Sequence, residues 1–190
     1  MSVIYDELEL ALLRDDLAYH QARVLLLVNA VSKAPGHARK LDGLTKLAKL
    51  DFLLRYPALA PKVLEQLSDS DPRLNLSQQE IEAPTEVEAP MIRYKYGPWD
   101  DRYYAIIGAL VGRGLLKYAK GRKGSVALAT TKEGRRLADD MGKVRDWKAL
   151  AERSEAIADA TAGMTGNTIK DLIYLKLDTL MDRPHRQVIQ

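Results

Sequence analysis

Residues 115–130 constrain the fold more than any other stretch of the chain. Two short β-prone segments, LLKYAK (115–120) and SVALAT (125–130), flank the connection Gly121-Arg122-Lys123-Gly124. A short connection with glycine at both edges, placed between two such segments, predicts a β-hairpin. Two cations would lie at the tip of this hairpin.

Amphipathic helices are predicted on both sides of the hairpin. Before it, DDRYYAIIGALVGR (100–113) has apolar residues at helical spacing, begins with two carboxylates and is followed by Gly114. After it, Thr131 is placed to cap the helix KEGRRLADDM (132–141). Helix, strand, basic hairpin, strand and helix in this order predict the second half of a winged helix domain, with the hairpin as its wing.

The first third of the chain is predicted to be helical. Asp16 precedes a segment that is apolar almost all round, DLAYHQARVLLLVNAVS (16–32), which predicts a central, nearly encircled helix. A second helix, 44–56, carries leucines on one stripe, keeps Lys46, Lys49 and Arg55 largely off that stripe, and stops at Pro57. Between these helices, KAPGHARK (33–40) combines a Pro-Gly turn with a basic cluster.

The remaining segments complete the predicted organisation. A short helix is expected at 61–67, a β-prone stretch at 91–99 that turns at Gly97-Pro98, and helices at 144–161 and 166–181, followed by a frayed tail at 183–190. The fold class is therefore mainly α with a small β-hairpin: a winged helix domain with additional N- and C-terminal helices. We expect a core at 1–141, with an N-terminal helical extension and an acidic loop at 68–90, and a C-terminal helical appendage at 142–190.

Composition narrows the function classes. The chain has no cysteine and three scattered histidines, His20, His37 and His185, which argues against thiol chemistry and against a metal site. Phosphate-cradling and common hydrolase motifs are absent, and the adjacent Asp100 and Asp101 suit helix capping better than shared acid/base work. We expect a non-enzymatic protein with no cofactor. No apolar run is long enough to cross a membrane and no secretory signal is present, so a cytoplasmic location is expected.

Charge is distributed unevenly along the chain. Residues 91–148 have a net charge of +8, whereas residues 65–90 have a net charge of −6. A basic face of this kind can steer DNA or an acidic partner, or can pair with the neighbouring acidic segment. The candidate nucleic-acid-binding residues are the wing cations Lys120, Arg122 and Lys123, joined by Arg135 and Arg136 on the following helix. Solvated surface charge is an equally weighted interpretation of the wing cations.

The predicted contact with DNA is weak and independent of sequence. Flexible cations on an exposed hairpin reach phosphates without reading bases. The helix 100–113 begins with two carboxylates and offers small residues at Ala105, Gly108, Ala109 and Gly112. Such a surface suits close protein packing better than hydrogen bonding to base edges.

Three blocks of the sequence carry a resemblance to a known family. GLTKLAKLDFLLRYP (43–57), YKYGPWDDRYYAIIGALVGRGLL (94–116) and TTKEGRRLADDM (130–141) resemble the small middle components of bacterial ABC three-component systems, including the Lamassu-type antiphage operons. The blocks cover about a quarter of the chain. The resemblance implies a non-catalytic accessory subunit that works beside an SMC-like ABC ATPase and a nuclease-like effector. It supplies no catalytic or metal motif that could be transferred.

Two function classes therefore remain, with an enzyme as a residual third. The first is a non-catalytic winged helix adaptor of an SMC-like ATPase complex in antiphage defence. This adaptor would contact double-stranded DNA weakly, and its sequence is compatible with an oligomer. The alternative is a winged helix transcriptional regulator or antitoxin that binds an operator as a dimer. A neighbouring gene for an SMC-like ATPase would favour the first, and an adjacent toxin gene would favour the second.

Overall fold

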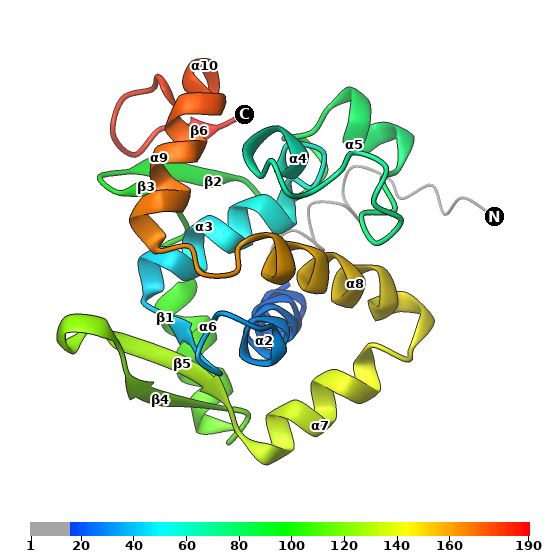
Figure 1. Cartoon of the computed structure of the whole chain (residues 1–190), viewed down its shortest axis with the longest axis vertical. Helices are drawn as coiled ribbons and strands as arrows, with labels where there is room; N and C mark the ends of the chain where they lie inside the picture. Colours follow the sequence, from blue (N-terminus) through cyan, green and yellow to red (C-terminus); the bar gives the residue numbers. More distant parts are fainter. Residues whose placement is uncertain (1–15) are drawn as a thin grey trace.

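Helix α2 (Leu17–Lys33) lies at the centre of the molecule and is seen end-on in Figure 1. The computed structural model describes residues 16–190. The Asp16 carboxylate caps the helix by accepting the Ala18 N–H at 2.8 Å, and the residues from Arg23 to Val31 are all buried. The predicted central, encircled helix is thus confirmed, together with its cap.

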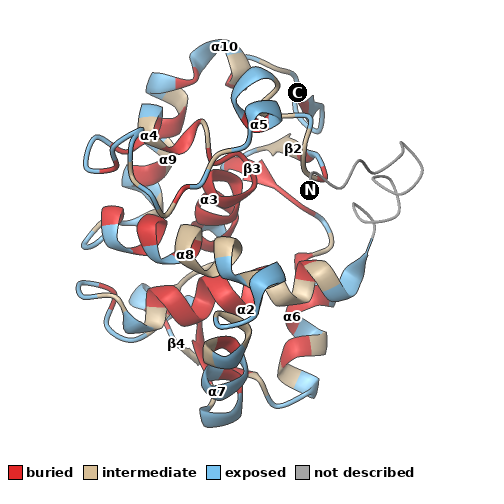
Figure 2. Ribbon diagram, turned by 90° about the vertical axis from the view of Figure 1, so that its right-hand side faces the viewer, coloured by how far each residue is buried: buried red, intermediate tan, exposed pale blue. Residues whose placement is uncertain are grey.

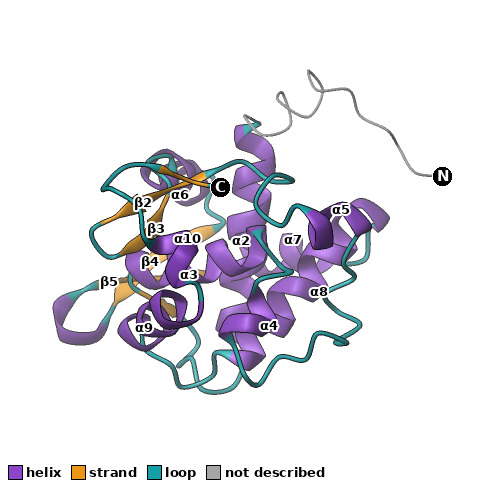
Figure 3. Cartoon of the chain, turned by 90° about the horizontal axis from the view of Figure 1, so that it is seen from above, coloured by secondary structure: helices purple, strands orange, loops and turns teal. Residues whose placement is uncertain are grey.

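The other elements surround α2. The helices are α3 (Leu44–Arg55), α4 (Ala60–Val63), α5 (Gln78–Glu82), α6 (Tyr103–Gly112), α7 (Lys132–Met141), α8 (Arg145–Ala160), α9 (Gly166–Lys176) and α10 (Asp178–Met181). The strands are β1 (Leu41–Asp42), β2 (Met91–Tyr94), β3 (Gly97–Trp99), β4 (Leu116–Lys120), β5 (Val126–Thr130) and β6 (Val188–Ile189). The described part of the chain is mainly α with a small β part, as expected, and the β part consists of two small antiparallel sheets. The strands lie toward one side, and α4, α5, α7 and α8 lie toward the other (Figure 3).

The predicted β-hairpin forms one of these sheets. β4 and β5 pair antiparallel from Leu116↔Thr130 to Lys120↔Val126, and a single 3₁₀ turn at Arg122–Gly124 closes the tip. The two-residue strand β1 adds to the other edge of β5, giving the order β1-β5-β4. Thr131 then caps α7 by accepting the Gly134 N–H at 2.9 Å. The cap was predicted from sequence; β1 was not.

The second sheet differs from the sequence prediction. Its order is β3-β2-β6, so Gly97 and Pro98 lie in a strand and the turn falls two residues earlier, at residues 95–96. The expected frayed tail instead supplies β6, which pairs with β2 through Met91↔Ile189. A two-residue strand is stable here because the sheet supplies its partners, a long-range contribution that local sequence does not reveal.

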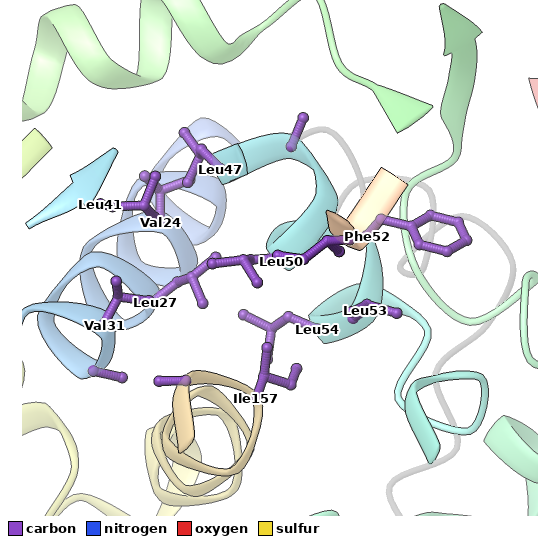
Figure 4. Packing of buried hydrophobic residues seen from close by; sticks show 14 of the residues in the cluster. Val24, Leu27, Val31, Leu41, Leu47, Leu50, Phe52, Leu53, Leu54 and Ile157 are labelled. Atoms are coloured by element: carbon purple, nitrogen blue, oxygen red, sulfur yellow. The ribbon is translucent and has the colours of Figure 1, made fainter. Parts of the chain in front are cut away.

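The C-terminal helices share one hydrophobic core with the rest of the described chain. We expected residues 142–190 to be an appendage, but α8 packs along α2 and α3. Figure 4 shows Ile157 of α8 beside Leu54 of α3, in the same cluster of buried residues as Leu27 and Val31 of α2. The buried residues concentrate on α2 and α3 at the middle of the molecule (Figure 2).

The acidic segment at 68–90 contains more structure than the predicted loop. Ser77 and Glu80 form a capping box at the start of α5. Arg153 of α8 reaches Glu80 at 2.6 Å and also donates to the carbonyl of Leu74. The part of the expected N-terminal helical extension that falls on residues 1–15 lies outside the described residues. Within residues 16–190, no helix combines the length and apolar character needed to cross a membrane.

Candidate nucleic-acid interface

The three wing cations predicted as phosphate contacts are exposed at the end of the β4–β5 hairpin. Lys120 ends β4, and its carbonyl accepts a hydrogen bond from Lys40 Nζ at 2.7 Å. The backbone N–H of Arg122 donates to Asp42 Oδ1 at 3.0 Å. Lys123 adopts a left-handed backbone conformation with φ of 51° at the tip. Contacts from residues 40 and 42 therefore fix the backbone of the hairpin tip, while its cationic side chains are exposed.

Beside the tip lies a polar cavity of about 630 Å³, which we call the basic hollow. The hairpin tip, the loop after α2, the start of α3 and the loop before α9 form its walls. Four cationic side chains line it, from Lys40, Lys46, Arg122 and Lys123, together with the carboxylate of Asp42. The structure thus brings two of the predicted wing cations together with two lysines that sequence reasoning did not select.

The first turn of α3 also faces the basic hollow. Its N-cap residue is Gly43, with φ of 96° and no side-chain capping hydrogen bond, and Gly43, Thr45 and Lys46 line the cavity. The first backbone N–H groups of a helix have no partner within the helix, and the macrodipole places partial positive charge there. By contrast, Thr165 caps α9 by accepting the Thr168 N–H. The α3 terminus adds backbone donors to the cationic side chains.

Lys46 is the most enclosed cation of the basic hollow. Its side chain donates to the Met164 carbonyl at 2.7 Å, and the whole residue is only 6% exposed. His37 Nε2 lies 2.7 Å from the Ala158 carbonyl, so this nitrogen carries a proton, and Nδ1 is left to accept from Lys46 at 3.3 Å. Burial lowers the pKa of Lys46 and, with help from the Lys46 charge, that of His37. An incoming anion would offset this cost and favour the charged lysine.

The other two predicted cations lie apart from the basic hollow. Arg135 and Arg136 are exposed on α7, which follows the end of β5 away from the hairpin tip. Arg136 forms an ion pair with Glu133 at 2.7 Å, one turn earlier on the same helix. Neither arginine lines the cavity, so the structure separates them from Arg122 and Lys123.

A buried ionic cluster beneath α6 was missed by sequence reasoning. Asp51 accepts from Arg23 at 2.7 Å, from Arg55 at 3.0 Å and from the Tyr103 hydroxyl at 2.6 Å. Arg55 also reaches Asp100 at 2.6 Å. The helical pattern placed Arg55 with Lys46 and Lys49 off the apolar stripe, yet all three are buried. A charged residue off the apolar stripe of a helix is normally exposed to solvent. The buried partners of these residues are distant in sequence, so no local pattern predicts the pairing.

The ionic cluster has the properties of a structural feature rather than of a reactive site. Burial opposes ionisation of Asp51, but Arg23 and Arg55 outweigh it and lower its pKa to about 2. Asp100 was expected to cap a helix; it instead accepts from the backbone and guanidinium of Arg102, just before α6. Despite its burial, the pKa of Asp100 lies well below its usual range because Arg102 and Arg55 bind the charged form. Each carboxylate oxygen of Asp51 and Asp100 is paired, which suits cross-linking of α2, α3 and α6.

Histidine and carboxylate side chains are the possible metal ligands among the described residues. Among residues 16–190, no group of three or more histidine, cysteine, aspartate or glutamate side chains is placed to hold a metal ion. His20 and His37 are both buried, His20 between the guanidinium groups of Arg23 and Arg102.

Comparison with known proteins gives no match: no family model, no curated protein and no solved structure matches the chain.

Proposed function

We propose that this protein is a non-catalytic winged helix subunit that binds the DNA backbone without reading its sequence. The observation that carries the proposal is the basic hollow, where Arg122 and Lys123 of the hairpin tip converge with Lys40, Lys46 and the uncapped start of α3. Phosphate oxygens accept hydrogen bonds from cationic side chains and from backbone N–H groups at the start of a helix. Such contacts hold a duplex whatever its sequence.

The order of elements supports a winged helix domain. Helix α2, strand β1 and helix α3 are followed, after an insertion, by helix α6 and the hairpin β4–β5, and β1 pairs with β5. In the proposed domain, β4–β5 is the wing and α6 takes the position of the recognition helix. Residues 56–102, with the second sheet, then form an insertion between the second and third helices of the domain.

The exposed face of α6 favours backbone binding over operator recognition. Ala105, Gly108 and Gly112 are exposed there and have no hydrogen-bonding side chains. Asp101, just before the helix, is exposed and pairs with Arg186 at 2.7 Å, so its carboxylate offers no hydrogen-bond donor to a phosphate or a base edge. A recognition helix needs donors and acceptors for base edges near its start. The regulator or antitoxin therefore becomes an outcome of the test rather than a second proposal.

The family resemblance supports the wider role. The three blocks shared with the middle components of ABC three-component systems support a role as an adaptor beside an SMC-like ABC ATPase and a nuclease-like effector in antiphage defence. In such an assembly a weak, sequence-independent grip on DNA is sufficient, because the partner subunits add their own contacts.

Fluorescence anisotropy with several unrelated duplexes at two salt concentrations tests the DNA part of the proposal. We expect similar affinities for all duplexes, roughly 10⁻⁴ to 10⁻⁶ M near physiological salt, with a steep loss as salt rises. Changing Lys40, Arg122 and Lys123 to alanine should weaken binding to every duplex alike and flatten the salt dependence.

Matched variants distinguish the contribution of the basic hollow to DNA affinity from that of the overall positive charge. Alanine at Lys143, Arg145 and Lys148, three exposed cations around the start of α8, removes the same charge and should leave most of the affinity. Alanine at Arg135 and Arg136 measures what α7 contributes. Strong preference for one palindrome would instead identify an operator-binding regulator, and an unchanged affinity of the hollow variant would show that its cations are only solvated charge.

A further inference from the structure

A second cavity, lined by aromatic rings, lies next to the basic hollow. It has a volume of about 310 Å³, and the rings of Tyr94, Tyr96, Trp99 and Tyr104 line it. We call it the aromatic pocket. Its volume is at the lower end of the range for pockets that bind small organic groups. Two of the rings are open to solvent, since Tyr96 is 50% exposed and Tyr104 is 68% exposed.

The folded segments around the aromatic pocket hold it open. Tyr94, Tyr96 and Trp99 come from the β2–β3 hairpin and its turn, and Tyr104 comes from the first turn of α6. The Trp99 ring lies 5.7 Å from the Tyr94 ring, 6.0 Å from the Tyr104 ring and 5.3 Å from the buried Tyr103 ring, centroid to centroid. Trp99 is only 8% exposed and is fixed by these contacts, so the ring surface open to a flat ligand comes mainly from Tyr96 and Tyr104.

Charge decides which flat ligand fits. Asp101 at the rim forms an ion pair with Arg186 at 2.7 Å, so its carboxylate is already neutralised. Thr45, in the first turn of α3, lines both the aromatic pocket and the basic hollow. The adjoining cavity is cationic, which disfavours a methylated ammonium group although aromatic rings often bind one. A ligand with an aromatic end and an anionic end matches both cavities.

We propose that the aromatic pocket binds an unpaired nucleobase of a DNA strand whose phosphates lie in the basic hollow. The inference rests on the proposed function and specifies its substrate: DNA with a single-stranded extension or gap rather than a fully paired duplex. Bases within a duplex are stacked and cannot enter a pocket unless they are extruded, whereas unpaired bases stack readily on aromatic side chains. Stacking tolerates any base, in agreement with binding that is independent of sequence.

Two duplexes of the same sequence test this inference by fluorescence anisotropy, one blunt and one with a short thymidine extension. We expect the extended duplex to bind at least about fivefold more tightly, the lower end of what stacking one base on an aromatic side chain contributes. The double variant Tyr96→Ala/Tyr104→Ala should lose this preference and keep its affinity for the blunt duplex. Tyr96→Phe/Tyr104→Phe retains both rings and should keep the preference.

A matched control and a second readout make the test specific. Tyr118 is 57% exposed on β4 and does not line the aromatic pocket, so Tyr118→Ala should leave the preference unchanged. The chain has two tryptophans. In a Trp147→Phe background, Trp99 is the only one, and its fluorescence should be quenched by the extended duplex and not by the blunt one.

The outcomes separate the two proposals. Equal wild-type affinity for both duplexes, or a Tyr96→Ala/Tyr104→Ala variant that keeps the preference, would overturn the nucleobase inference alone. Absence of salt-dependent binding to the blunt duplex would overturn the proposed function itself. Saturable binding of a trimethyllysine peptide that depends on Tyr96 and Tyr104, with no effect of the extension, would assign the pocket to a cation and contradict the inference.

Discussion

At the scale of single residues, the ionic cluster is the feature that most departs from an ordinary hydrophobic core. Asp51 lies between Arg23 and Arg55, and all three side chains are fully buried. A buried ion pair gives little net stability relative to a well-packed apolar core, but removal of one member leaves an uncompensated charge. The cluster therefore fixes how α2 and α3 meet, and it makes the fold sensitive to the loss of either partner.

Substitution of Asp51 should be severely destabilising. In Asp51→Asn two buried guanidinium groups lose their shared carboxylate, so we expect the free energy of unfolding to fall by about 3–5 kcal/mol. Urea unfolding followed by circular dichroism measures this change. Asp140→Asn, at an exposed position on α7 with a surface partner in Lys143, is the control and should change stability by well under about 1 kcal/mol. Equal effects of the two changes would contradict a role for the cluster in stability.

The same carboxylate predicts a dependence of stability on acid. The folded pKa of Asp51, about 2, lies below the ordinary value of 3.8, so the unfolded state binds protons more readily between these values. Its contribution is complete above about pH 4–5 and is lost as pH falls toward 2. The free energy of unfolding of the wild type should therefore drop in this window, and the drop should be smaller in Asp51→Asn. A parallel pH dependence in both proteins would contradict this assignment.

Lys49 differs from Asp51, because its buried charge should destabilise the folded protein rather than stabilise it. It is 1% exposed, donates to the Thr45 carbonyl at 3.0 Å, and burial, together with the nearby Lys170, lowers its pKa to about 8. Between pH 8 and 10.5 the unfolded state holds this proton more tightly, so stability should rise with pH. Lys49→Met should stabilise the protein at pH 7 by on the order of 1–3 kcal/mol. Thermal unfolding at pH 7 and above pH 10 checks it, since the gain should shrink at high pH.

At the scale of elements, two helical glycines have opposite surroundings. A Cβ on Gly134 of α7 would lie 1.9 Å from the carbonyl oxygen of Leu115, so no other residue fits without moving the backbone. A Cβ on Gly108 of α6 would have nothing within 4 Å. The close approach of α7 to Leu115, just before β4, therefore depends on Gly134, whereas Gly108 leaves an uncovered surface on α6.

These two glycines should respond differently to alanine. Gly134→Ala should destabilise the protein by on the order of 2 kcal/mol or more, since the strain falls on backbone. Gly108→Ala should stabilise it by about 0.5–1 kcal/mol, because alanine favours the helix and meets no neighbour. Denaturant unfolding of both variants provides the comparison. A destabilising Gly108→Ala would show that this face of α6 is packed in solution.

The elements also show which parts of the fold sequence could predict. The β4–β5 hairpin, the caps at Asp16 and Thr131 and the central helix were predicted because their signals are local: glycine spacing, capping residues and helical periodicity. Strands β1 and β6 were not, because each consists of two residues that depend on a distant partner. For the same reason the wing cations were selected as candidates, whereas Lys40 and Lys46 were not, since the basic hollow forms only where separate loops meet.

At the scale of the whole molecule, the described chain combines a side with two adjoining cavities and an uncovered helix. The basic hollow and the aromatic pocket lie next to each other, between the tip of the β4–β5 hairpin, the start of α3 and the β2–β3 hairpin. The exposed small residues of α6 have no side chains that could read bases. Together with the resemblance to middle components of ABC three-component systems, this arrangement leads to a final prediction about a protein partner.

We expect the full chain to co-purify with an SMC-like ABC ATPase encoded beside it. The complex should persist in size-exclusion chromatography at micromolar concentration in at least one nucleotide state. Gly108→Leu tests whether α6 takes part, because the variant has room to fold as a monomer yet would obstruct close packing of a partner. Lys148→Leu, at an exposed position on α8, is the control and should leave the complex intact. If the two proteins stay apart in every nucleotide state, the adaptor role is wrong and only the proposed binding to the DNA backbone remains. If Gly108→Leu binds the ATPase normally, the partner uses a surface other than α6.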